Sequence, residues 1–260
     1  MDIIYFSPTG TTRAVVEAIV RGMDAGQRNV VDLTLPRATY PSCTSEAAII
    51  GVPVYAGRVP ELAARRLREH VCGHGRPAAL VVVYGNRAYE DALLELHNIA
   101  EELGFIPVAG AAFVGEHSFS TPDCPVAEGR PDAEDKRLAL EFGRFVREKL
   151  SQTKDGLPKS HLQVPGNFPY RDGVQAVAIS PDTLQENCVL CGECELMCPT
   201  GAITLTSESV ETDKTLCLRC CACIRTCRYA ARVMLHPKIQ EFGKILNEKF
   251  ARRAEPEMFL

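Results

Sequence analysis

Short apolar runs alternate with segments of helical periodicity through roughly the first 150 residues. The apolar runs predict five strands, at residues 2–6, 29–33, 47–54, 78–84 and 105–114. The fourth run contains the letters LVVV, as expected for a central parallel strand that is buried on both faces. Between the runs, apolar residues recur every three or four positions and predict helices. Strands that alternate with helices indicate an α/β fold with a parallel, doubly wound sheet.

Several predicted helices carry recognisable end signals. Pro60 opens a helix that contains Leu62 and Leu67, since proline is well tolerated in a first helical turn. Gly104 stands where a C-terminal cap is expected, directly after a helical pattern. A last helix over 131–150 is charged on its outer face. These elements predict a first domain over residues 1–152.

Beyond the first domain the pattern changes twice. Residues 153–177 contain several glycines and prolines without periodicity, and we expect a linker that lies across the first domain. A cysteine-rich unit follows over 178–236. Residues 237–260 are predicted to form an amphipathic helix that docks on one of the two domains or, alternatively, binds a partner. Its apolar stripe consists of Ile239, Phe242, Leu246 and Phe250.

Composition restricts the class of protein rather than the fold. The chain has 260 residues, of which 46% are hydrophobic and 24% charged, and its formal net charge is −4. These values are typical of a soluble globular protein and do not favour a nucleic-acid binder. No apolar stretch approaches the ~20 residues that cross a bilayer, and the N-terminus lacks a signal-peptide pattern. We therefore expect a cytoplasmic protein without a membrane span.

Cysteines carry the strongest chemical signal. Of twelve cysteines, nine fall between Cys188 and Cys227, and the spacing C-x2-C-x2-C-x3-C occurs twice, 29 residues apart. A disulfide framework is disfavoured because the chain has no secretion signal. A zinc site is disfavoured because zinc ligands usually come as two separated pairs. The two motifs consist of Cys188, Cys191, Cys194 and Cys198, and of Cys217, Cys220, Cys223 and Cys227.

This repeat resembles that of bacterial ferredoxins, small α+β domains that hold two [4Fe–4S] clusters. In that family, each cluster takes three cysteines from one motif and the last cysteine of the other. The resemblance implies that one cluster takes Cys188, Cys191, Cys194 and Cys227, and the other Cys217, Cys220, Cys223 and Cys198. The chain departs from the family in that Arg228, not proline, follows the second motif. Cys221 would break the spacing and is not expected to be a ligand.

A second signal follows the first predicted strand. The loop Ser7-Pro8-Thr9-Gly10-Thr11-Thr12 precedes a helix, whose N–H groups and dipole favour an anion. The hydroxyls add donors without charge, and no P-loop lysine is present. The alternative is a threonine-rich helix cap. We predict that a phosphate group binds to Ser7, Thr9, Gly10, Thr11 and Thr12.

The loop resembles the flavodoxin phosphate loop, (S/T)-x-T-G-x-T, which binds the phosphate of FMN. Flavodoxin-like sheets have five strands in the order 2-1-3-4-5, and loops after the third and fourth strands clasp the flavin ring. The resemblance implies that Tyr55 and Tyr89 stack on this ring. The residues in the two loops are Pro53, Val54, Tyr55, Ala56 and Gly57, and Tyr84, Gly85, Asn86 and Tyr89.

Together, the two parts resemble the fused flavodoxin–ferredoxin proteins of anaerobic bacteria and archaea. The resemblance implies an electron-transfer protein that converts between the two-electron chemistry of FMN and the one-electron chemistry of two [4Fe–4S] clusters, serving redox partner proteins. Two alternatives stay open. In one, the first domain has lost its flavin. In the other, a flavin-dependent reductase acts on a small molecule, with a pocket of Arg58, Arg87, Tyr89 and His117.

Overall fold

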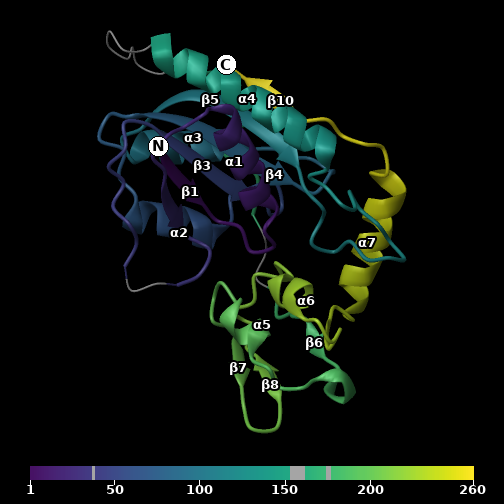
Figure 1. The fold of residues 1–260 in the computed structure, drawn as a ribbon. Helices are drawn as coiled ribbons and strands as arrows, with labels where there is room; N and C mark the ends of the chain where they lie inside the picture. Colours follow the sequence, from purple (N-terminus) through teal and green to yellow (C-terminus); the bar gives the residue numbers. More distant parts are fainter. Residues whose placement is uncertain (37–38, 153–161, 174–176) are drawn as a thin grey trace.

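The computed structural model of the chain describes residues 1–36, 39–152, 162–173 and 177–260 (Figure 1). Its main sheet has six strands in the order β10-β5-β4-β3-β1-β2. All pairs are parallel except β10 with β5. Without β10 the order is 2-1-3-4-5, which confirms the predicted flavodoxin-like sheet. The strands are β1 (Asp2–Tyr5), β2 (Asn29–Asp32), β3 (Ala48–Pro53), β4 (Pro77–Tyr84), β5 (Ile106–Val114) and β10 (Glu257–Phe259).

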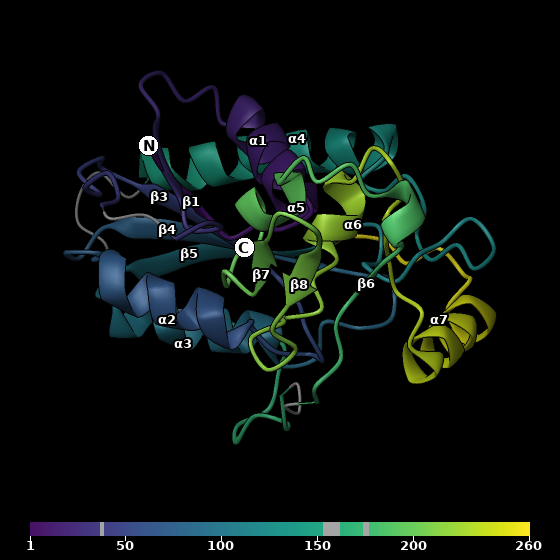
Figure 2. The ribbon, with the colours of Figure 1, turned by 90° about the horizontal axis from the view of Figure 1, so that it is seen from below.

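Helices cover both faces of this sheet (Figure 2). On one face α1 (Thr11–Gly22) packs against α4 (Ala133–Gln152), and α2 (Glu61–His70) and α3 (Ala92–Glu102) cover the other. Successive strand residues point to opposite faces, so neighbouring apolar residues of one strand enter two different cores. Because both faces of these strands are buried, most of their positions are apolar, and the sequence shows continuous apolar runs.

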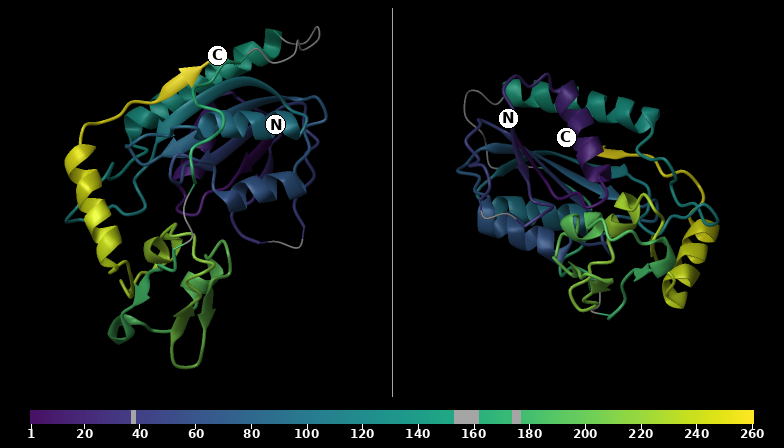
Figure 3. Two further views of the ribbon diagram at one scale, coloured as in Figure 1. Left: turned by 180° about the vertical axis from the view of Figure 1, so that it is seen from behind. Right: turned by 60° about the horizontal axis from the view of Figure 1, so that its bottom comes forward.

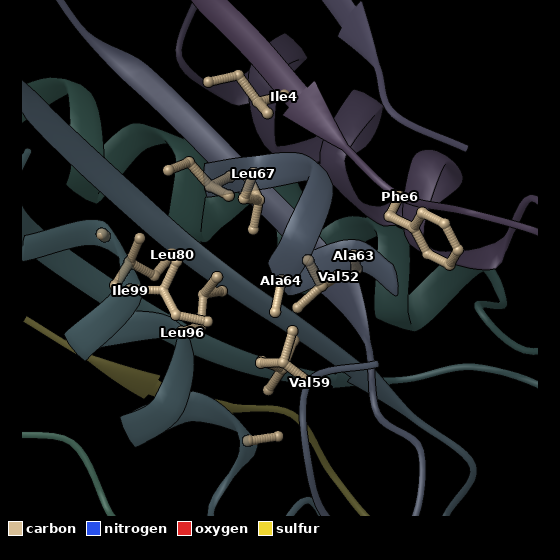
Figure 4. Close-up of a cluster of buried hydrophobic side chains, with 14 of the residues drawn as sticks. Ile4, Phe6, Val52, Val59, Ala63, Ala64, Leu67, Leu80, Leu96 and Ile99 are labelled. Atoms are coloured by element: carbon tan, nitrogen blue, oxygen red, sulfur yellow. The ribbon is translucent and has the colours of Figure 1, made fainter. Parts of the chain in front are cut away.

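The core on the side of α2 and α3 is built from buried aliphatic and aromatic side chains (Figure 4). Full burial of one large apolar side chain contributes ~1.5–3 kcal/mol, so many such contacts hold the strands in fixed relative positions. The carboxyl ends of the strands therefore form a rigid edge on which loops can build a site. The labelled members of this core are Ile4, Phe6, Val52, Val59, Ala63, Ala64, Leu67, Leu80, Leu96 and Ile99.

The C-terminal segment differs from the predicted single helix over 237–260. Helix α7 (Pro237–Lys249) ends well before the C-terminus, and the chain then leads to β10 on the outer edge of β5 (Figure 3). The amide of Asn86 donates to the carbonyls of Phe250 and Arg252 and accepts from the N–H of Ala254. These bonds hold the turn, and β10 pairs backbone groups that the edge strand would otherwise leave open.

The cysteine-rich unit is small and lies below the carboxyl edge of the main sheet (Figures 1 and 2). Its secondary structure consists of two short antiparallel pairs and two short helices, with a 3₁₀ turn at Gln185–Asn187. The pairs are β6 (Asp182–Thr183) with β9 (Arg232–Val233) and β7 (Ile203–Leu205) with β8 (Val210–Thr212), and the helices are α5 (Glu193–Leu196) and α6 (Ala222–Thr226).

Apart from Val177, the described part of the predicted linker consists of residues 162–173, which lie across α3. The backbone N–H groups of Asn167 and Arg171 donate to the carboxylate of Asp91, at 2.8 and 2.7 Å. Asn98 donates to the hydroxyl of Tyr170 at 2.6 Å. The remaining linker positions, 153–161 and 174–176, lie outside the described residues. Within the described parts of the chain, no helix combines the length and apolarity needed to cross a membrane.

Two glycines let α1 and α4 pack closely. A methyl group on Gly143 would lie 2.0 Å from the carbonyl oxygen of Ile19, and one on Gly22 would lie 1.9 Å from that of Leu140. Both obstacles are backbone atoms, which cannot rotate away. The two helices must therefore separate if either glycine gains a side chain.

We expect Gly143→Ala to lower the free energy of unfolding by about 1–3 kcal/mol, because overpacking forces backbone shifts. Gly243→Ala, in the middle of α7, is the matched control. Its new methyl group would meet its nearest neighbour, the carbonyl oxygen of Phe119, at an ordinary 3.7 Å. Alanine should stabilise that helix by up to ~1 kcal/mol. Urea unfolding followed by circular dichroism measures both; equal stabilities would contradict the close packing of α1 and α4.

Candidate functional site

A cavity of about 540 Å³ lies between the carboxyl edge of the main sheet and the cysteine-rich unit. Its walls come from the loops after β1, β3, β4 and β5, from residues near the end of the linker, from the cysteine-rich unit and from α7. A volume of this order suits a cofactor or small ligand. The site is thus assembled from segments that lie far apart in the sequence.

The loop after β1 forms one end of this cavity. Gly10 adopts a left-handed φ of 83° and directly precedes α1, so the chain turns sharply and presents the helix N-terminus. Thr9 and Thr11 line the cavity. The hydroxyl of Thr12 is buried and has no hydrogen-bond partner among the described residues. An unpaired buried hydroxyl beside a helix N-terminus fits an anion such as a phosphate.

Ser7 has a different position from the threonines. Its hydroxyl accepts the N–H of Arg13 at 3.0 Å, and its own N–H donates to the hydroxyl of Thr34 at 2.8 Å. Ser7 therefore shapes the loop and does not line the cavity. We propose that it supports the phosphate site without contacting the phosphate directly.

The loops after β3 and β4 form the middle of the cavity. Ala56 and Gly57 both have left-handed φ values, of 51° and 78°, which place a tight turn beside the open space. Gly85 has no room for a side chain because a methyl group there would lie 2.2 Å from the ring of His117. The lining from these two loops includes Pro53, Val54, Tyr55, Ala56, Gly57, Tyr84, Gly85, Arg87 and Ala88.

Five residues of the sequence-predicted set lie outside the cavity lining, namely Ser7, Gly10, Thr12, Asn86 and Tyr89. Tyr89 packs on Tyr84, with ring centroids 5.4 Å apart, and donates to Glu257 of β10 at 2.9 Å. Asn86 binds the chain after α7, as described above. Arg58 likewise pairs with Glu95, its Nε lying 2.7 Å from the carboxylate. These side chains hold neighbouring segments in place.

His117 lies in the cavity wall after β5. Its Nδ1 accepts the N–H of Phe119 at 3.0 Å, which assigns the proton of the neutral ring to Nε2. The ring also contacts Phe242 of α7 in an edge-on arrangement, with centroids 6.5 Å apart. Burial lowers the pKa of His117 to about 4, and the charge of Arg87 acts in the same direction. The histidine is therefore neutral at physiological pH.

Several cavity residues could not be found from the sequence. The cysteine-rich unit supplies Leu218 and Arg219, and α7 supplies Lys238, Ile239 and Phe242. The sequence places Ile239 and Phe242 on the apolar stripe of a docking helix. No motif assigns any of the five residues to the cavity, because they reach it only when the second unit and α7 dock on the first domain.

The eight motif cysteines gather around two smaller cavities. One is lined by Cys188, Cys191, Cys194 and Cys227, and the other by Cys198, Cys217, Cys220 and Cys223. Each cavity thus combines three cysteines of one motif with the last cysteine of the other. This is the exchange that the resemblance to two-cluster ferredoxins implies, and we call these the outer and the inner cysteine cavity, respectively.

The surroundings of the cysteines fit a four-iron cluster. Backbone N–H groups of Ala202, Arg219 and Ala231 donate to the sulfurs of Cys198, Cys217 and Cys227, at 3.3–3.4 Å. Within the described residues, no three Cys, His, Asp or Glu side chains are grouped closely enough to hold a single metal ion. A four-iron cluster is held by four cysteine thiolates, which is the number that each cysteine cavity provides.

Burial affects the protonation of these thiols. It raises the pKa of Cys220 to about 12, and it raises the pKa of Cys223, on which the charge of Arg232 acts in the opposite direction. A thiol of this kind becomes a thiolate when a metal takes the place of its proton. Loading of the site is therefore coupled to proton release.

The backbone explains the extra thiol at Cys221. Left-handed φ values recur 29 residues apart, at Leu190 and Arg219 and at Gly192 and Cys221. Gly192 precedes α5 as Cys221 precedes α6. Cys221 therefore occupies the turn position of Gly192 in the repeat. Its buried thiol donates to the carbonyl of Arg219 at 3.6 Å.

The inner cysteine cavity adjoins the large cavity. Leu218 lines both of them and packs against the core of the first domain. Tyr55 belongs to the large cavity, and burial raises its pKa well above the ordinary value, with the nearby thiols of Cys220 and Cys221 acting in the same direction. Cys191 of the outer cavity is exposed, so the three cavities follow one another from the first domain toward the protein surface.

The histidine generates a pH-dependent prediction. An unfolded histidine has a pKa of ~6.5, whereas folded His117 has one of about 4. Between these values the unfolded chain binds more protons, so stability falls as the pH falls. We expect this histidine to remove about 1 kcal/mol of unfolding free energy between pH 7.5 and 5.5. Anaerobic urea unfolding of the wild type and of His117→Gln measures the difference; the same pH dependence in both proteins would contradict it.

Comparisons with known proteins agree with this division of the chain. A family model described as the 4Fe-4S binding domain matches residues 183–204, which contain the first cysteine motif. No curated protein matches the sequence. Similar solved structures include three flavodoxins. The flavodoxin from the domain Archaea has 15% identity and a TM-score of 0.39, and that from Streptococcus pneumonia TIGR4 has 14% identity and a TM-score of 0.40. A mutant flavodoxin from Pseudomonas aeruginosa has 16% identity and a TM-score of 0.40. Each covers 58% of this chain and 97% of the flavodoxin.

TM-scores this low do not establish a fold, so the assignment of the first domain depends on the observed strand order. That order is 2-1-3-4-5 in a parallel sheet, with a loop cavity at its carboxyl edge. The second unit contains the residues that match the iron–sulfur family model. The two parts support an electron-transfer role, and they identify the chain as a flavodoxin-like domain fused to a ferredoxin-type 4Fe-4S binding domain.

Proposed function

We propose that this protein passes electrons between FMN in the large cavity and two [4Fe–4S] clusters in the cysteine cavities. In this role it converts between two-electron and one-electron transfer for partner redox proteins. The observation that carries the proposal is the shared wall at Leu218, which lines both the large cavity and the inner cysteine cavity. A single side chain between two cofactor sites favours direct exchange within one chain.

The residues of the chain have distinct tasks in this proposal. Thr9, Thr11 and Thr12, with the N-terminus of α1, hold the FMN phosphate, while Tyr55 and the turn at Gly57 contact the ring. When bound, the flavin supplies two-electron chemistry and each cluster supplies one-electron chemistry. The cysteine-rich unit and α7 cover the cavity and restrict the access of water to it.

The order of the three cavities supports a spatial order for the proposed electron transfer. The inner site exchanges electrons with the flavin, and the outer site exchanges them with a partner. Support comes from the outer cavity, whose lining includes the exposed residues Val189, Cys191 and Tyr229. A partner can approach a cluster closely only where its surroundings reach the surface.

The same geometry supports the proposed domain limits. We assign residues 1–152 to the flavodoxin-like domain, 153–177 to the linker, 178–236 to the ferredoxin-type domain and 237–260 to a C-terminal segment. This segment contributes α7 to the cavity and β10 to the sheet. We propose a cytoplasmic location, which suits iron–sulfur chemistry in a reducing compartment.

One observation favours reduction of a small molecule as a second candidate function. The large cavity is also lined by Lys238 of α7 and by His117, which retains a proton on Nε2. A cation and a neutral donor on one side of a flavin could orient a small polar acceptor. Steady turnover of such an acceptor by the protein alone would favour this function over that of a carrier.

Cofactor analysis of anaerobically purified protein tests the proposal directly. We expect about eight iron and eight sulfide per chain, as two clusters require, together with one FMN. Anaerobic titration with dithionite should consume about four electrons per chain, two at the flavin and one at each cluster. Eight iron without any uptake of FMN would exclude the converter, and four iron would exclude the second cluster.

The unpaired hydroxyl of Thr12 gives a sharper test of the phosphate site. Thr12→Val keeps the shape of the side chain and removes its donor, so we expect FMN to bind about 10–100-fold more weakly, the usual loss for one hydrogen bond to a charged group. Thr204→Val, at an exposed position of β7, is the matched control and should bind normally. Fluorescence titration with FMN measures both. If Thr12→Val binds FMN as tightly as the wild type does, Thr12 does not contact the phosphate, and the proposed phosphate site is contradicted.

A further inference from the structure

Arg232 is a buried charge between the two cysteine cavities. It lies on β9, is only 3% exposed and belongs to the lining of both the outer and the inner cavity. One of its terminal nitrogens lies 3.9 Å from the sulfur of Cys223. The guanidinium remains protonated in proteins, so a full positive charge lies in the interior of this small domain.

Among the described residues, the oxygen atoms that accept hydrogen bonds from this guanidinium are all neutral. Its terminal nitrogens donate to the hydroxyls of Thr183 and Thr212, at 2.5 and 3.0 Å, and to the carbonyl of Pro181 at 3.1 Å. Its Nε is buried without a partner. The ion pairs among the described residues include none for Arg232, whereas the equally buried Arg130 pairs with Asp135. A buried charge without a counter-charge is costly.

The proposed clusters would supply the missing counter-charge. Each cluster would be held by four cysteine thiolates of the chain, so the cluster with its ligands would be negatively charged and would gain one more negative charge on taking up an electron. A cation between the two would interact with both in a medium of low dielectric constant, where charges act strongly. Charges and hydrogen bonds near a cluster are among the factors that set its reduction potential.

We propose that Arg232 is a shared electrostatic positioning residue, whose charge stabilises the reduced form of both clusters and raises both reduction potentials. The inference rests on the proposed function, because it requires clusters in both cysteine cavities. The step it affects is the uptake of one electron by a cluster from an external donor. No proton moves and no bond forms or breaks in that step, and the guanidinium keeps its charge.

A merely structural role would act through the hydrogen bonds instead. Arg232 links the chain before β6 to β8 through Pro181 and Thr212, so its loss could loosen the domain without any electrostatic effect. Two substitutions separate the roles. Arg232→Gln removes the charge and keeps a polar side chain, while Arg232→Lys keeps the charge and loses the planar fork of donors.

The experiment is a potentiometric titration of the cluster-loaded full-length protein with dithionite, followed by electron paramagnetic resonance. At a fixed potential, we expect the ratio of reduced to oxidised cluster in Arg232→Gln to fall about tenfold at both sites, which corresponds to ~59 mV for one electron. Arg232→Lys should stay within about threefold of the wild type. The control Arg228→Gln removes an exposed charge next to Cys227 and should have little effect because water and salt screen it.

The outcomes distinguish the two proposals. Fewer than about eight iron in the wild-type protein would contradict the proposed function itself. Eight iron with unchanged potentials in Arg232→Gln, or a shift at one cluster only, would overturn the role of Arg232 and leave the proposed function intact. If Arg232→Gln fails to retain iron, Arg232→Lys decides: potentials close to the wild type support the electrostatic role, and a tenfold fall at both sites contradicts it.

Discussion

The buried guanidinium of Arg66 ties the two halves of the molecule together. It is carried by α2, and its nitrogens donate to the carbonyls of Leu33 and Thr34, just beyond β2, and to the carbonyl of Pro199 in the cysteine-rich unit. All three bonds are 2.7–2.8 Å long. Because Pro199 directly follows Cys198, this arginine connects the carboxyl edge of the sheet to the wall of the inner cysteine cavity.

Other contacts hold the same domain boundary. Leu218 reaches the core of the first domain, and Arg225 of α6 donates to Glu116 after β5 at 2.5 Å. With these contacts in place, the large cavity and the inner cysteine cavity share a wall at Leu218. The last segment of the chain adds a second attachment, since α7 lines the cavity and β10 completes the sheet. The relative position of the proposed cofactors thus depends on packing between segments and not on the linker.

Sequence patterns predicted those elements of the fold that are formed by residues close together in the chain. The five parallel strands agree within one residue at each end, because a doubly buried strand leaves an uninterrupted apolar run. The cysteine repeat identified both motifs, since a cluster requires fixed spacing. The sequence also indicated the turn before α1, because Gly10 and the neighbouring threonines lie at a helix N-terminus; phosphate binding there stays a prediction. The prediction of a helix to the last residue was wrong beyond Lys249, because the edge of β5 and the amide of Asn86 hold that segment.

By itself, the sequence determined an α/β domain with a loop rich in threonine and glycine before its first helix, followed by a unit with two cysteine motifs. Each of these depends on residues that lie close together in the chain, where spacing alone decides which side chains share a face or a turn. Only the tertiary structure decided that Leu218 separates two cavities, that Tyr89 faces Glu257 instead of the cavity, and that Arg232 lies between the two sets of cysteines. Those relations join residues far apart in sequence, and they depend on how buried surfaces fit together.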